Sequence, residues 1–193
     1  MFKSLSYRIT DVLVNNEIIE NDDFEIYRYG FETLIYFIVN ISVALLIGII
    51  FDRFIHTIVF LSCYCTLRQF TGGYHARNYT ECTLTFAAIY LITIFAANNI
   101  DIVRYKYLSI FILMMSIVII YKIAPLEHRN KPLSNKEKQK YRMIAMKITS
   151  IIVMIFIITI VRNIFVEYLV YSLFAIVWIS ILLIIGFYRL ALL

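Results

Sequence analysis

The chain has 193 residues, of which 62% are hydrophobic and 16% charged, and its formal net charge is +5. Soluble domains carry about 25% charged residues, so this composition excludes a disordered chain and a nucleic-acid-binding domain, and it predicts one membrane-embedded domain over residues 1–193. Three cysteines in so apolar a chain do not indicate the disulfide framework of a secreted scaffold.

Residues 1–32 are predicted to form a segment at the membrane surface. Phe2, Leu5, Ile9 and Val12 recur at helical spacing, which is typical of an amphipathic helix that lies in the interface. The alternative is a partly ordered polar tail. Either one leads into the first hydrophobic run.

Six hydrophobic runs without Asp, Glu, Lys or Arg follow, and they predict about six transmembrane helices. The runs cover residues 33–51, 54–67, 83–100, 107–121, 148–161 and 168–188. The second run has 14 residues, which at ~1.5 Å per residue cover about 21 Å of a ~30 Å hydrocarbon layer. This run therefore either extends into the next segment or is short and re-entrant. The expected fold is an all-α polytopic membrane protein with an N-terminal amphipathic helix.

Lysine and arginine are distributed unevenly between the two sides that six spans define. Fourteen of them fall in residues 1–32, 68–82, 122–147 and the C-terminus, and four fall on the other side. The positive-inside rule then predicts that both termini, the 68–82 segment and the 122–147 loop face the cytoplasm. The 122–147 loop has a net charge of +6. This charge either keeps the loop on the cytoplasmic side and in contact with anionic lipid, or it binds an acidic peptide.

The 68–82 segment contains residues suited to catalysis. Gly72-Gly73 is the only Gly-Gly pair of the chain, and such a pair ends a helix and allows close backbone approach. His75 and Cys82 form a candidate base and nucleophile, because an imidazole can take the thiol proton. Residues seven apart lie about 10.5 Å apart along a helix, so the chain must bend between them for proton transfer. The alternative is that both are structural residues at the membrane interface.

Cys63 and Cys65 are expected to be packing residues, because residues two apart point to nearly opposite sides of a helix. The cysteine and histidine spacings match no common zinc pattern, and the chemistry of a thiol and an imidazole needs no cofactor. We therefore expect neither a metal nor a cofactor.

The residues between the second and third runs resemble the accessory gene regulator B family. The resemblance rests on Arg68, Gly72, Gly73, His75, Ala76 and Cys82. It continues in the basic loop, at Ala124-Pro125 and at Lys131-Pro132.

This resemblance implies a cysteine endopeptidase in the cell membrane of a Gram-positive bacterium. Such enzymes remove the C-terminal part of a small propeptide of the AgrD type and hold the peptide as a thioester, from which a thiolactone or lactone ring closes to give a quorum-sensing signal. Cys82 would then be the nucleophile and His75 the general base. The positions that would bind substrate or support the site are Arg68, Gly72, Gly73, Lys131 and Pro132. The resemblance also implies the lipid bilayer and a homodimer as partners, and no nucleic acid.

Two other classes stay open from the residues alone. The first is a small transporter subunit, against which the absence of ionisable residues inside the runs counts. The second is a non-catalytic membrane adaptor, which would leave the Gly-Gly-x-His-x₆-Cys segment without a role.

Overall fold

The computed structural model describes residues 2–73, 79–126 and 133–191. Within these residues the chain forms seven α-helices and one short 3₁₀ helix. They are α1 (Phe2–Asn15), η1 (Asn21–Asp23), α2 (Phe24–Ile50), α3 (Phe54–Thr71), α4 (Tyr79–Asn99), α5 (Lys106–Ile123), α6 (Asn135–Arg162) and α7 (Val166–Ala191). Five helices of the described part, namely α2, α4, α5, α6 and α7, are long and apolar enough to cross a membrane. The expectation of an all-α membrane protein is confirmed.

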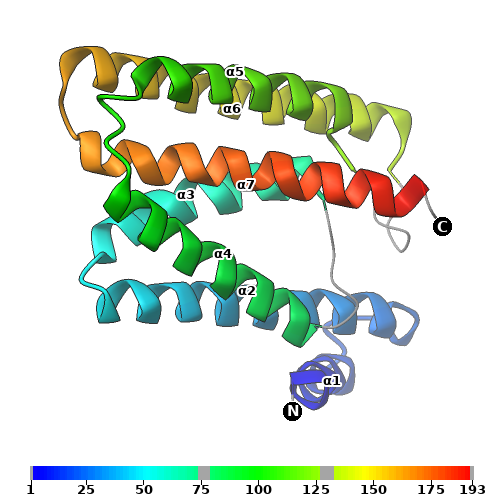
Figure 1. Cartoon of the computed structure of the whole chain (residues 1–193). Helices are drawn as coiled ribbons and strands as arrows, with labels where there is room; N and C mark the ends of the chain where they lie inside the picture. The colour runs from blue at the N-terminus through cyan, green and yellow to red at the C-terminus, as the bar shows by residue number, and fades with distance from the viewer. Residues whose placement is uncertain (1, 74–78, 127–132, 192–193) are drawn as a thin grey trace.

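From α2 to α7, successive helices run in alternating directions between two ends of a bundle (Figure 1). We call them the Gly72 end, where α3, α5 and α7 finish, and the Arg53 end, where these three helices begin. The helix α3 has 18 residues, which at ~1.5 Å per residue cover about 27 Å. It begins beside the end of α2 and runs to the Gly72 end of the bundle (Figure 1). The second hydrophobic run therefore extends into the following segment and does not turn back.

The centre of the bundle is α7, which packs against α3, α4, α5 and α6. In the most apolar stretch of α7, 67% of the residues are buried, whereas 11% are buried in the corresponding stretch of α2. The more polar α3 packs against α2, α6 and α7, and its His56, Thr57 and Thr71 are buried. Polar side chains are costly in lipid, so α3, which lacks the long apolar stretch of the five candidate spans, is covered by its neighbours.

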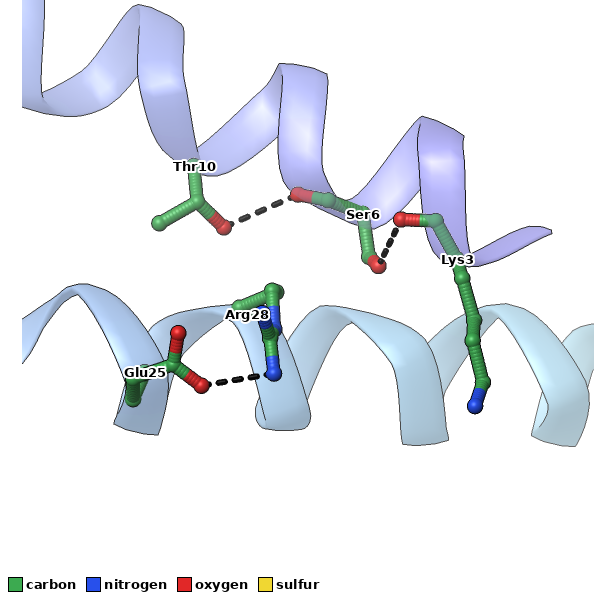
Figure 2. Close-up of polar contacts among 5 residues, drawn as sticks. All are labelled: Lys3, Ser6, Thr10, Glu25 and Arg28. Atoms are coloured by element: carbon green, nitrogen blue, oxygen red, sulfur yellow. Dashed lines mark hydrogen bonds and ion pairs between the residues drawn. The ribbon is translucent and has the colours of Figure 1, made fainter. Parts of the chain in front are cut away.

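The N-terminal helix α1 packs against α2 with its small polar face. Ser6 and Thr10 are fully buried at this seam, and their hydroxyls donate to the Lys3 carbonyl at 3.0 Å and the Ser6 carbonyl at 2.9 Å (Figure 2). Leu5 and Val12 stay exposed, at 46% and 56%. The amphipathic helix is confirmed, with its polar seam toward the protein and apolar side chains left for the membrane surface.

The 122–147 segment differs from the loop that was expected, because α6 begins at Asn135 and extends beyond the hydrophobic run. Ser134 and Glu137 form a capping box: the Ser134 hydroxyl accepts from the Glu137 amide at 3.3 Å, and the Glu137 carboxylate accepts from the Ser134 amide at 2.9 Å. The cations from Lys136 to Lys147 therefore lie on helix α6.

Candidate functional site

An aromatic cluster between α3 and α4 holds the start of α4 at the Gly72 end. The ring of Phe86 on α4 lies 5.3 Å from that of Tyr64 on α3, and Tyr64 stacks on Phe60 at 5.4 Å. Cys82 lies one turn before Phe86, in the first turns of α4, and is partly buried. Aromatic pairs at these distances are stabilising, so this packing ties the turn of α4 that follows Cys82 to the middle of α3.

The Gly72-Gly73 pair ends α3 in a backbone conformation that side chains disfavour. Gly72 has φ 65° and Gly73 has φ 124°, both in the region that favours glycine. A Cβ added at Gly72 would overlap with the carbonyl of Leu126, and one added at Gly73 would overlap with the guanidinium of Arg68. The expected close approach of other groups to the Gly-Gly backbone is confirmed at both positions.

Arg68, in the last turn of α3, contacts this turn. Its Nη1 donates to the Gly72 carbonyl, and its guanidinium is within electrostatic range of Cys82 and of the Tyr64 hydroxyl. Tyr64 is buried one helical turn before Arg68 on α3. Four of the residues predicted from the sequence, Arg68, Gly72, Gly73 and Cys82, thus gather at one end of the bundle.

The sequence did not single out the part that α5 and α6 play at this end. The Leu126 amide donates to the Thr71 carbonyl at 2.9 Å, so the chain that leaves α5 runs directly beside Gly72. Arg142 on α6 donates from Nε to the Ala124 carbonyl at 2.9 Å. The Ala124-Pro125 pair marked this segment in the sequence, but no local pattern distinguishes Arg142 from the other cations around it.

Three of the predicted site residues, His75, Lys131 and Pro132, lie outside the described residues. Their roles stay predictions. Cys63 and Cys65 lie on α3, are partly buried and pack against the hydrophobic core. Their prediction as packing residues is confirmed.

The Arg53 end is built differently. The imidazole of His56 lies 4.6 Å from the ring of Tyr168 and 5.0 Å from that of Tyr171, both on α7. Its Nε2 lies 3.6 Å from a Glu167 carboxylate oxygen. Arg53 donates to the side chain of Asn98 at 3.2 Å, which ties the start of α3 to the end of α4.

Comparison with known proteins assigns the chain to a family. The family model of accessory gene regulator B (AgrB) matches residues 6–187, so the chain belongs to this family. It is 29% identical over 147 residues to an AgrB-like protein of Clostridium perfringens strain 13, covering 72% of this chain and 68% of that protein. An AgrB-like protein of Clostridium perfringens strain SM101 is 28% identical over 169 residues, which cover 83% of this chain and 78% of the relative.

A more distant relative is an AgrB-like protein of Listeria innocua. It is 24% identical over 139 residues, which cover 70% of this chain and 67% of the relative. No solved structure matches the chain.

Proposed function

We propose that this protein is a membrane cysteine endopeptidase that removes the C-terminal part of a small propeptide of the AgrD type. The peptide is held as an acyl thioester on Cys82 and released by ring closure as a thiolactone or lactone. The observation that carries this proposal is the meeting of Arg68, the Gly72-Gly73 turn and Cys82 at one end of the bundle, in a chain of the AgrB family.

In the first step the Cys82 thiolate attacks the carbonyl carbon of the scissile peptide bond. A C–S bond forms, the C–N bond breaks, and the leaving amine takes the proton that His75 removed from the thiol. A cation near a sulfur favours its thiolate form, and we assign this part to Arg68, which lies at the same end of the bundle as Cys82. Arg68 and the two glycines support the nucleophile and do not react.

In the second step a thiol or hydroxyl of the bound peptide gives its proton to His75 and attacks the thioester carbonyl. A new C–S or C–O bond forms, the C–S bond to Cys82 breaks, and Cys82 leaves as a thiolate. The attack gains from proximity because both groups belong to one bound chain. Water must be kept from the thioester during this time. Cys82 is partly buried at a helix interface, which fits this need.

The substrate would approach from the cytoplasm, where the charge distribution directs the Gly72 end. An acidic propeptide tail would meet the cations at the start of α6, of which Lys136 and Lys140 are exposed. The opposite charges attract over a Debye length of about 8–10 Å. We place the protein in the cell membrane of a Gram-positive bacterium, with a homodimer as its expected assembly.

The test of the function is co-expression with a small propeptide of the AgrD type, followed by mass spectrometry of the peptide products. We expect a cleaved fragment and a cyclic product one water lighter than the linear acid of the same residues. The Cys82→Ser variant should stall processing while the uncleaved propeptide still copurifies with it, because a hydroxyl is far harder to deprotonate than a thiol. Cleavage at the wild-type rate by this variant contradicts the mechanism.

The orientation has a separate test. Cysteines introduced at Lys136 and at Asn99, each in a background without native cysteines, report the Gly72 end and the Arg53 end. In intact cells an impermeant thiol reagent should label position 99 and leave position 136 unlabelled. The reversed pattern would place the Cys82 site outside the cell and would contradict the proposal that the substrate approaches from the cytoplasm.

A further inference from the structure

Two consecutive residues of α6 hold the chain on both sides of the Gly72–Leu126 contact. The ring of Tyr141 lies edge-on to that of Phe70, at 5.9 Å, and Phe70 is two residues before Gly72. The guanidinium of Arg142 donates from Nε to the Ala124 carbonyl at 2.9 Å, and Ala124 is two residues before Leu126. One turn of α6 therefore contacts both segments that meet at the glycine pair.

The Gly72–Leu126 contact has little to hold it by itself. Among the described residues it is held by one backbone bridge, in which the Leu126 amide donates to the Thr71 carbonyl at 2.9 Å. There is no space for a Cβ on Gly72, so side-chain packing cannot strengthen the contact from that side. Support must come from neighbouring elements.

Arg142 is suited to give this support. Ala124 follows the last turn of α5 and is fully buried, and the last carbonyls of a helix lack partners within it. A hydrogen bond from a guanidinium to such a carbonyl is charge-assisted and stronger than one between neutral groups. It fixes the exit of the chain from α5 relative to α6.

We propose that Arg142 is a positioning residue of the peptidase site. It holds residues 124–126 against Gly72, so that the glycine turn keeps its hydrogen bond with the Arg68 guanidinium. This inference rests on the proposed function. It adds α6 to the site as the helix that stabilises the contact between Gly72 and Leu126.

The first test compares Arg142→Ala with Lys147→Ala, which removes the same charge from an exposed position of the same helix. Displacement of a catalytic group by about 1 Å costs on the order of 100-fold in rate. We expect Arg142→Ala to lower kcat about 10- to 100-fold with KM within about twofold, and Lys147→Ala to stay near wild type. Arg142→Lys should restore part of the rate, because an ammonium can donate one hydrogen bond to the same carbonyl.

The second test reads the site without the propeptide. In a Cys63→Ala, Cys65→Ala background, the rate at which a small permeable reagent alkylates Cys82 reports the surroundings of the thiol. We expect Arg142→Ala to change this rate severalfold and Lys147→Ala to leave it unchanged. This measurement stays informative even where the wild-type protein cleaves no propeptide, so failure of the proposed function and failure of the positioning role are distinguishable.

A purely structural cap on α5 gives a different result. Arg142→Ala would then lower the melting temperature, while the alkylation rate of Cys82 and kcat per folded protein stay at wild-type values. That outcome overturns the positioning role. A rise in KM with unchanged kcat also overturns it, because such a change marks uniform binding of the substrate.

Discussion

The two ends of the bundle use the same helices, α3, α4 and α7, in opposite ways. At the Arg53 end, large rings fill the space between helices, with His56 packed against Tyr168 and Tyr171. At the Gly72 end the main chain itself makes the contact, because Gly72 and Leu126 approach more closely than any side chain on Gly72 would allow. Side chains therefore make the contacts between helices at the Arg53 end, whereas two backbone segments contact each other directly at the Gly72 end.

The arginines at the two ends of α3 show the same contrast. Arg53 donates to the side chain of Asn98 and so ties two helices together. Arg68 folds back onto the carbonyl of Gly72 in its own chain, with its charge near Cys82. A scissile peptide bond must come into contact with its nucleophile, so chemistry is expected at the Gly72 end, where two consecutive residues carry no side chain and Cys82 lies in the next helix.

The largest effect is expected from loss of the nucleophile or the base. Cys82→Ala and His75→Ala should each lower propeptide cleavage by about 1,000-fold or more, because nucleophile and base act as a unit. Cleavage is measured by mass spectrometry of the propeptide in membranes with equal amounts of inserted protein. Cys63→Ala is the matched control and should stay near wild type. Retained cleavage in Cys82→Ala would sink the mechanism.

The next largest effect concerns the bare backbone at the Gly72 end. Gly73→Ala should lower the cleavage rate on the order of 100-fold, because the new Cβ displaces the Arg68 guanidinium and the φ of 124° is strained for alanine. Gly30→Ala is the control, since nothing lies within 4 Å of a Cβ added there. Equal rates for the two variants would remove the glycine turn from the site.

At the Arg53 end a substitution should affect stability and not chemistry. His56→Ala removes a buried ring from its two tyrosine neighbours and should destabilise the fold by about 1–3 kcal/mol, which lowers the melting temperature in detergent by a few degrees. The cleavage rate per folded protein should stay within about twofold of wild type. Ile58→Ala, an exposed position of the same helix, controls for general loss of apolar surface. A large fall in rate at unchanged stability would show that the two ends are coupled.

The smallest effect is expected from the cations at the start of α6. Replacing Lys136, Lys138 and Lys140 by glutamine should raise the apparent KM about three- to tenfold with little change in kcat, because contacts made equally in ground and transition states affect binding alone. The effect should shrink as salt rises.

A matched control for the lysine variant removes three cations from the Arg53 end, at Arg104, Lys106 and Arg162, and should leave KM unchanged. An equal rise in KM in both variants would refute capture by α6. Mixed topology in the lysine variant would show that these lysines serve membrane orientation, and the capture hypothesis would then be dropped.

The sequence by itself determined the class of fold and most of its helices. Hydrophobic runs of about 20 residues predict spans because the bilayer sets their length and the backbone must satisfy its own hydrogen bonds there. The same local logic identified Gly72-Gly73 as a helix end and the surface helix α1. It was less informative for α3, whose polar residues shortened its run, and for α6, whose charged first turns looked like a loop.

Only the tertiary structure decided which segments meet at the Gly72 end. Leu126 lies more than fifty residues after Gly72 in the sequence, and the space between them depends on how α3, α5 and α6 pack. In the sequence Arg142 is one of several cations in a basic segment. Only the packing of α6 against the end of α5 shows that it contacts the Ala124 carbonyl. Helix formation follows from neighbours along the chain, whereas a contact between two helix ends depends on the packing of every helix between them.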